Sequence, residues 1–241
     1  MKYHLVVPTI MTNPAQEFKC LDQLVEQFTS NGLDFTLYFV ANVPITEFNN
    51  YQTTNKHIVK SISNLEFSIS RAINSIYESI KFEDNDILGF IQSDTFFRNP
   101  EWIIPITDIL HDPSFNAGVL GLRPHASNNT IKEGINFESK FTIHPCNWAD
   151  GVMLFTGKTY RLIGGFDENY FGDCESQDFC YQAIESGLTN YWCNDSSGYF
   201  GYKNRTVGFS FKARFNREEF LRKVEKSRKY LDIKWSQWKG I

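Results

Sequence analysis

Short apolar segments that alternate with amphipathic segments constrain this chain most. Residues 4–10, 35–41 and 87–91 are apolar runs of the length expected for buried strands. A helix signature, Asn13-Pro14 followed by apolar residues at helical spacing, lies between the first two runs. Isoleucines recur at helical spacing over residues 69–80. Strands that alternate with helices predict an α/β fold with a mostly parallel sheet flanked by helices.

The same alternation continues toward the C-terminus. Further elements are expected as a helix over 101–110, a strand over 117–122, a strand over 151–155, a helix capped by Ser176 and ending at 186, and a short strand over 191–193. Residues 42–57 and 123–150 show no clear periodicity and are expected to be loops. No repeat or linker interrupts the pattern, which favours a single domain over residues 1–241.

Charge is distributed unevenly along the chain. The net charge is −4, yet residues 201–241 contain 12 Lys or Arg and only 4 Asp or Glu. The acidic remainder argues against nucleic acid as a partner. A basic amphipathic helix is expected from residue 216, with its apolar residues packed on the body: Phe220, Leu221, Val224 and Leu231. Its cations could bring the protein to an anionic membrane surface, or the helix could only cap the fold.

Cysteine spacing and hydropathy bear on the compartment. The five cysteines are scattered, and no pair has the Cys-x-x-Cys spacing of a zinc site. No apolar run approaches the ~20 residues of a membrane-spanning helix, and the N-terminus does not look like a secretory signal. We therefore expect a cytoplasmic protein, with the inner face of the membrane as a further location that the basic tail would allow.

Two segments could carry chemistry. Gln92-Ser93-Asp94 follows the strand at 87–91, at the sheet edge where α/β proteins bind ligands. A carboxylate there could hold Mn²⁺ or Mg²⁺ on a diphosphate, or it could belong to an ordinary turn. The second segment begins at Gly164-Gly165-Phe166-Asp167-Glu168 and continues to Glu175 and Asp178 near a helix N-terminus. Such carboxylates stay ionised and could act as a base, or they could only complement the helix dipole.

Together these segments resemble family 2 of the GT-A (Rossmann-like) glycosyltransferases, near its rhamnosyltransferase-like members. The resemblance covers roughly residues 4–200. It is carried by the opening strand Val6-Val7-Pro8-Thr9, the helix segment Ser70-Arg71-Ala72-Ile73-Asn74, the strand end Gln92-Ser93-Asp94-Thr95, the Gly164–Phe171 stretch, and Glu175-Ser176-Gln177-Asp178 with the Cys180 that follows.

The resemblance implies a hexosyltransferase of polysaccharide or glycoconjugate biosynthesis. It would move a sugar from a UDP- or dTDP-linked donor to a glycan or lipid-linked glycan, with Mn²⁺ or Mg²⁺ and inversion. Residues 1–122 would bind the donor, 123–200 would form the acceptor and catalytic half, and 201–241 would be the basic tail. The implied donor residues are Pro8, Thr9, Asn42, Arg71, Asn74, Gln92, Ser93 and Asp94, with Asp94 also on the metal. The acceptor residues would be Trp148, Asp150, Gly151, Asp167 and Glu168, and the catalytic ones Glu175 and Asp178.

Several positions depart from the family pattern. Gln92 stands where the first metal-motif acid is usual, and Ser176 stands where the second acid of the Glu-Asp pair is usual. The late histidine has no counterpart near residues 199–202, and Ala41-Asn42 replaces the strand-end aspartate. A retaining enzyme and a non-catalytic sugar- or nucleotide-binding module therefore stay open. A nucleotidyltransferase would need a glycine-rich, basic loop after the first strand, and residues 9–15 contain no Gly, Lys or Arg.

Overall fold

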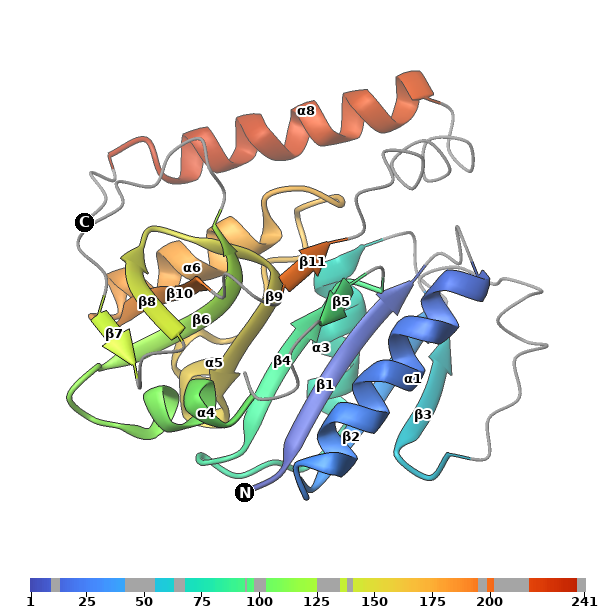
Figure 1. The fold of residues 1–241 in the computed structure, drawn as a ribbon. Coiled ribbons are helices and arrows are strands. Elements are labelled where there is room, and N and C mark those ends of the chain that lie inside the picture. Colours follow the sequence, from blue (N-terminus) through green and yellow to red (C-terminus); the bar gives the residue numbers. More distant parts are fainter. Residues whose placement is uncertain are drawn as a thin grey trace.

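The chain folds around one large mixed β-sheet (Figure 1). The computed structural model describes residues 1–9, 14–41, 55–62, 68–93, 95–97, 103–124, 135–137, 141–194, 199–201 and 217–237. Within these residues the sheet has nine strands in the order β3-β2-β1-β4-β9-β6-β10-β8-β7, and a two-stranded sheet pairs β11 with β5. The bounds of these two short strands are Tyr199–Gly201 for β11 and Thr95–Phe97 for β5.

One half of the sheet is parallel. It contains β1 (Tyr3–Thr9), β2 (Phe35–Ala41), β3 (Ile58–Ile62) and β4 (Ile87–Ile91). Leu5 and Val7 of β1 share a buried cluster with apolar residues of α1 (Pro14–Ser30), whereas Val6 belongs to a second cluster with α3 (Ile69–Ser79). The alternation of side chains along β1 thus explains why α1 covers one face of the sheet and α3 the other (Figure 1).

The other half of the sheet contains antiparallel pairs. The strand β9 (Ala149–Thr156) runs antiparallel between β4 and β6 (Ala117–Pro124). Beyond them, β10 (Thr189–Asn194) is parallel to β6, and β8 (Phe141–Cys146) and β7 (Ile135–Phe137) complete the edge. Three helices flank this half: α4 (Ile103–His111), α5 (Gly157–Ile163) and α6 (Glu175–Glu185). The expected α/β fold is confirmed, but its parallel pairing is confined largely to the first half.

Several details differ from the sequence-based prediction. Residues 58–62 form the strand β3, which was not expected, and the segment 123–150 contributes β7 and β8, although it was expected to be a loop. The helix α5 was not expected, and α6 is capped by Cys174 rather than by Ser176. The four unexpected elements are short, at three to seven residues each, so they show no periodicity long enough to indicate a helix or a strand.

The C-terminal helix α8 (Arg217–Lys234) lies along the end of the molecule toward which β1 and β4 point (Figure 1). Val224 and Leu231 are buried as expected, but Leu221 is 47% exposed and therefore faces solvent rather than the body. No helix of the described ranges is long and apolar enough to cross a membrane. The division of the chain into donor, acceptor and tail parts stays a prediction.

Candidate active site

The ends of β1 and β4 bring two predicted donor segments to the same sheet edge. The two strands are parallel neighbours, with Val6 paired to Phe90, so the segments that follow lie side by side. Thr9 is buried, and its hydroxyl donates to the Glu17 carboxylate. The backbone N–H of Gln92 donates to the Gly151 carbonyl at 3.0 Å, which ties the end of β4 to β9.

The structure describes only some of the other donor residues that were predicted at this edge. Pro8 is buried within β1, and Ser93 follows Gln92 with its side chain half-buried. Asn42 and Asp94 lie outside the described residues, so their assignments stay predictions. Among the residues that the structure describes, no group of three or more His, Cys, Asp or Glu could hold a metal ion. The binding of a metal through Asp94 stays a prediction.

Asn74 joins α3 to the glycine-containing loop that precedes α6. Its amide nitrogen donates to the Phe166 carbonyl at 2.8 Å and to Glu168 Oε1 at 3.1 Å. Its amide oxygen accepts from the Phe166 N–H at 3.0 Å and from the Tyr160 hydroxyl at 3.1 Å. All four hydrogen-bonding positions of this side chain are thus used within the protein. Its geometry is that of a residue that positions the loop, and a contact with the donor stays a prediction.

The backbone conformation of this loop explains why positions 164 and 165 are both glycine. Gly164 and Gly165 have φ angles of 87° and 97°, in the left-handed region that favours glycine. A Cβ on Gly165 would also lie 3.1 Å from the Asn74 Oδ1 and from the Tyr160 hydroxyl. The Gly-Gly pair is therefore required for the loop to turn close against α3.

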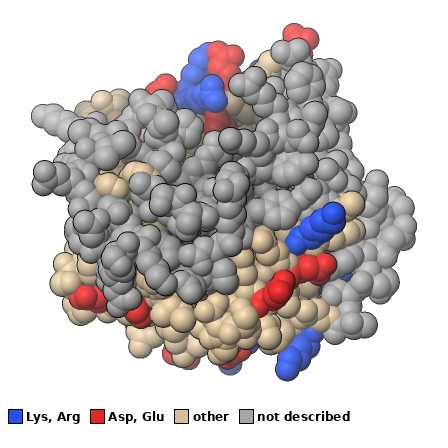
Figure 2. Space-filling view, in the orientation of Figure 1, with Lys and Arg blue, Asp and Glu red and all other residues tan. Residues whose placement is uncertain are grey.

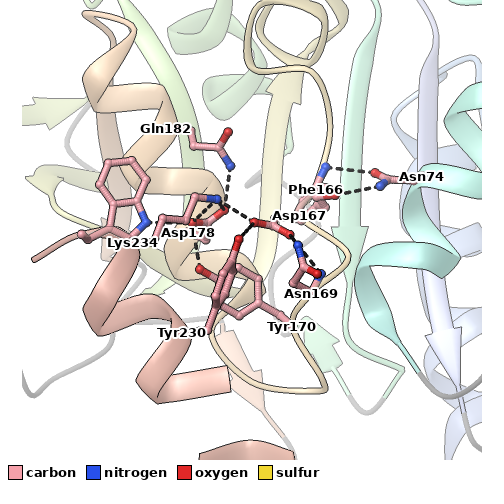
Figure 3. Close-up of polar contacts among 10 residues, drawn as sticks. Asn74, Phe166, Asp167, Asn169, Tyr170, Asp178, Gln182, Tyr230 and Lys234 are labelled. Atoms are coloured by element: carbon pink, nitrogen blue, oxygen red, sulfur yellow. Dashed lines mark hydrogen bonds and ion pairs between the residues drawn. The ribbon is translucent and has the colours of Figure 1, made fainter. Parts of the chain in front are cut away.

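The loop and α6 are joined to α8 by a cluster of polar side chains, drawn in Figure 3, that we call the Lys234 cluster: Asp167, Asp178, Tyr230, Lys234 and Trp235. The Lys234 Nζ lies 2.7 Å from Asp167 Oδ2 and 2.9 Å from Asp178 Oδ1. The Tyr230 hydroxyl donates to Asp167 at 3.0 Å, and the Trp235 indole N–H donates to Asp178 at 2.7 Å. One cation of the C-terminal helix thus bridges two carboxylates of the predicted acceptor and catalytic segments.

Asp178 is fully buried, and its carboxylate has many partners. Besides Lys234 and Trp235, it accepts hydrogen bonds from the Tyr170 hydroxyl at 3.0 Å and from the Gln182 amide at 2.6 Å. Burial, together with the neighbouring Asp178 side chain, raises the pKa of Tyr170, so the phenol stays protonated and donates. These contacts assign Asp178 a structural task, and a role as general base stays a prediction that the surroundings do not favour.

Asp167 lies in the same environment and is held as an anion. Burial acts to raise its pKa, but hydrogen bonds from Lys234 and from Asn169 outweigh burial and lower it. Burial likewise acts to lower the pKa of Lys234, and its two carboxylate partners outweigh this and raise it. Opposite charges therefore stabilise one another across the contact between the loop and α8.

Glu175 is the remaining predicted catalytic residue. It is the first residue of α6 and is buried, next to Cys174, whose φ of 75° is left-handed. Burial raises the pKa of the Cys174 thiol to about 12, with the Asp173 and Glu175 carboxylates acting in the same direction. The thiol is therefore protonated at neutral pH and is not an ionised nucleophile. The positive end of the helix dipole at this position stabilises negative charge. The assignment of Glu175 as a base stays a prediction.

The predicted acceptor residues occupy mixed environments. Trp148 is buried, and its ring packs edge-on against Tyr181 with centroids 6.1 Å apart. Gly151 has a φ of 81° and accepts the hydrogen bond from Gln92. The side chain of Asp150 lies outside the described residues. Glu168 contacts Asn74 and lies 3.4 Å from the Arg71 Nε.

Trp235 docks the C-terminal helix on the body through its hydrogen bond to Asp178. Lys234 and Tyr230, which are polar residues of a helix that looked solvated, were not identified from the sequence. Their positions one turn apart in α8, just before Trp235, were a usable signal, because residues four apart lie on the same helix face.

The sequence matches no model of a known protein family, and no curated protein matches it. Solved structures do match the fold. A mutant of Drosophila β-1,4-galactosyltransferase 7, in complex with manganese, UDP-Gal and xylobiose, matches with a TM-score of 0.55 at 13% identity, over 85% of this chain and 71% of its own. Residues 1–349 of TarS from S. aureus, in complex with UDP-GlcNAc, match with a TM-score of 0.56 at 14% identity, over 98% and 73%. These similarities confirm the GT-A fold.

Proposed function

We propose that this protein is a glycosyltransferase that moves a sugar from a nucleotide-sugar donor to a glycan acceptor. One observation carries the proposal: the chain shares its fold with structures of proteins that hold UDP-sugars. Two of the segments that resemble the family 2 enzymes, Val6–Thr9 and the one that begins at Gln92, lie at the carboxyl ends of parallel strands, where α/β proteins bind ligands. UDP- and dTDP-linked sugars are the donors that we propose, and a lipid-linked glycan is one form of the acceptor.

A divalent cation is part of the proposal. Hard oxygen ligands suit Mn²⁺ and Mg²⁺, and in such sites the donor's diphosphate supplies several of them. Asp94 is the carboxylate that we propose for the protein's share, with the neighbouring Gln92 amide in place of a second acid. The cation would stabilise the negative charge of the departing diphosphate.

We propose Glu175 as the base that takes the acceptor's proton in an inverting displacement. Asp178 is surrounded by Lys234, Trp235 and two further donors, so its carboxylate has no free position toward a substrate. Glu175 lies at the opening turn of α6, immediately after the loop that Asn74 positions. A retaining mechanism is the alternative if the Glu175 carboxylate is not needed for turnover.

A binding module without turnover is the second candidate. It is favoured by the engagement of Asp167 and Asp178 in the Lys234 cluster and by Ser176 at the position where the family has an acid. In that case the protein would bind a nucleotide sugar and release no sugar from it.

Donor hydrolysis separates the two candidates. We expect UDP or dTDP to stabilise the protein in a thermal-shift series, because a ligand at about 100 times its dissociation constant adds about 2.7 kcal/mol. We further expect slow release of sugar from one nucleotide sugar of a panel when Mn²⁺ is present. Binding without release would favour the module, and absence of any nucleotide shift would contradict both candidates.

A further inference from the structure

A cavity of about 250 Å³ lies between the N-terminus of α3, residues 168–171 and α8. Its charged lining consists of Arg71 from α3, Glu168 from the loop, and Lys223 and Lys226 from α8. We call it the α3–α8 cavity. Three cations and one carboxylate give its lining an excess of positive charge.

The cations of this cavity differ in how far they are neutralised. Arg71 lies 3.4 Å from Glu168, and the Lys223 Nζ lies 3.5 Å from Glu219 and 4.6 Å from the centre of the Phe171 ring. Lys226 has no ion pair within the described ranges of the chain. The N-terminus of α3 adds the positive end of a helix dipole beside the cap residue Ser68, which also lines the cavity. These groups together favour a bound anion.

Lys226 differs from two of the other cations of α8, Arg228 and Lys229. Arg228 pairs with Asp173 at 2.6 Å and Lys229 with Glu225 at 2.8 Å, so each is compensated at the surface. Figure 2 shows such basic and acidic side chains next to one another at the end of the molecule where Figure 1 places α8. Lys226, by contrast, lines a cavity and lacks a carboxylate partner in the described part of the chain.

The dimensions and position of the cavity indicate which ligand it takes. It is smaller than the roughly 300–1,000 Å³ of sites that enclose a whole drug-sized ligand, so it suits one group of a larger molecule. Its lining includes Arg71, which the family resemblance places at the donor, but no residue from the ends of β1, β2 or β4, where the nucleotide is expected. It includes instead the loop that leads directly to Glu175, the proposed base for the acceptor.

We propose that the α3–α8 cavity binds an anionic group, a phosphate or a carboxylate, of the acceptor. That the anionic group belongs to an acceptor rests on the proposed function, whereas the anion site itself rests on the cavity. Lys226 and Arg71 would contact the oxyanion, and Ser68 would supply a hydroxyl beside the helix N-terminus. The acceptor would thus be an acidic glycan or a glycan joined through phosphates, rather than a neutral one.

The first test measures binding without turnover. Inorganic phosphate, glycerol 3-phosphate and glucuronate serve as anionic probes, with glycerol and glucose as neutral controls, in calorimetric titrations at low salt. We expect the anionic probes alone to bind, and Lys226→Gln to weaken them about five- to tenfold, as the loss of one charge-assisted contact would. Arg222→Gln is the matched control, since Arg222 is an exposed cation of the same helix that does not line the cavity. Its affinity for the probes should stay that of the native protein.

Three results would overturn the anion site: no binding of any anionic probe, equal weakening by both variants, or binding that Lys226→Gln leaves unchanged. A UDP titration distinguishes the donor from the acceptor. We expect Lys226→Gln to leave the UDP affinity unchanged, and a loss as large as that for phosphate would assign the cavity to the donor instead. That result would contradict the acceptor assignment.

The second test uses turnover. With a donor that is hydrolysed, Lys226→Gln should raise the KM for anionic acceptors about five- to tenfold and leave kcat and the KM for neutral acceptors unchanged. An equal rise for neutral acceptors would overturn the proposal. If no donor is hydrolysed at all, the proposed function fails and the assignment to an acceptor fails with it, while the phosphate titrations still decide whether the cavity binds anions.

Discussion

Replacing Lys234 with methionine removes the cation that bridges Asp167 and Asp178. Methionine keeps most of the volume and the apolar stem of lysine, so the variant tests the charge rather than the packing. Asp178 would remain buried with neutral donors alone, among them Tyr170 and Trp235. Breaking a buried ion pair commonly costs 3–5 kcal/mol. Because the Lys234 side chain is 28% exposed and these donors remain, we expect a loss of about 2–3 kcal/mol.

The matched control is Lys229→Met in the same helix. The Lys229 Nζ lies 2.8 Å from Glu225, but both side chains are more than 60% exposed, so solvent screens this pair and Lys229→Met should unfold with nearly the free energy of the native protein. Urea unfolding followed by tryptophan fluorescence gives the two free energies, and thermal unfolding should show a fall of roughly 4–12 °C for Lys234→Met.

The helix α8 could also detach before the sheet unfolds, since different parts of a protein open with different free energies. Hydrogen exchange resolves this, because the amides of residues 217–237 would then lose protection in Lys234→Met while those of β1 keep theirs. If Lys234→Met and Lys229→Met have equal unfolding free energies and equal exchange, the Lys234 cluster does not hold α8 and the reasoning is refuted.

Four further results are expected. Because its partners lower the pKa of Asp167, its contribution is complete above the unfolded value of about 3.9 and is lost as the pH falls below it, so acid unfolding should be less steep in Lys234→Met. Glu175→Gln should lower turnover roughly 10²–10⁴-fold with little loss of stability, whereas Asp178→Asn should mainly lower stability; the reverse would make Asp178 the base. Asp94→Asn should abolish the Mn²⁺-dependent part of nucleotide binding in calorimetry, and unchanged metal affinity would make Asp94 a turn residue. Binding to anionic vesicles should be weak and lost at high salt, since most cations of α8 are paired; equal binding to neutral vesicles would rule out an electrostatic contact.

The sequence predicted best the elements whose signals are local. The strands β2 and β4 have the predicted bounds, because each is an unbroken apolar run that is buried on both faces of the sheet. The helix α3 was predicted from its isoleucines, and its apolar face is buried between β1 and the loop before α6. In both cases the apolar residues that are buried in the structure are also the residues whose pattern indicates the element in the sequence.

Elements whose stability depends on distant partners were not predicted. The strand β8 pairs with β10, some 50 residues further along the chain, and its own sequence, Phe-Thr-Ile-His-Pro-Cys, alternates over only four residues before the proline. The edge strand β3 contains Lys60 and Ser61 among its five residues. Local periodicity carries no information about such pairings, so the segment of β8 looked like a loop and the strand β3 was not identified.

The same limit applies to the candidate site. The strand-end and loop segments were found from residue types and order, but the contacts that give each carboxylate its task join residues far apart in the sequence. Lys234 reaches Asp178 across 56 positions, and Asn74 reaches Phe166 across 92. From the sequence, Asp167 and Asp178 could be read as ligand-binding or catalytic groups, because their partners in α8 were not visible.

These contacts change how the glycine-containing loop is understood. Gly164, Gly165 and Asn74 set the path of the backbone, and Asp167 receives its hydrogen bonds from Asn169 and from α8. In the segment that most resembles the family 2 enzymes, these contacts thus fix the backbone of the loop and hold the C-terminal helix against it. Since the loop ends at Glu175, its shape decides where the first turn of α6 lies. Loss of the Lys234 cluster should therefore act on catalysis through the position of that turn, as a lower kcat that accompanies the loss of stability.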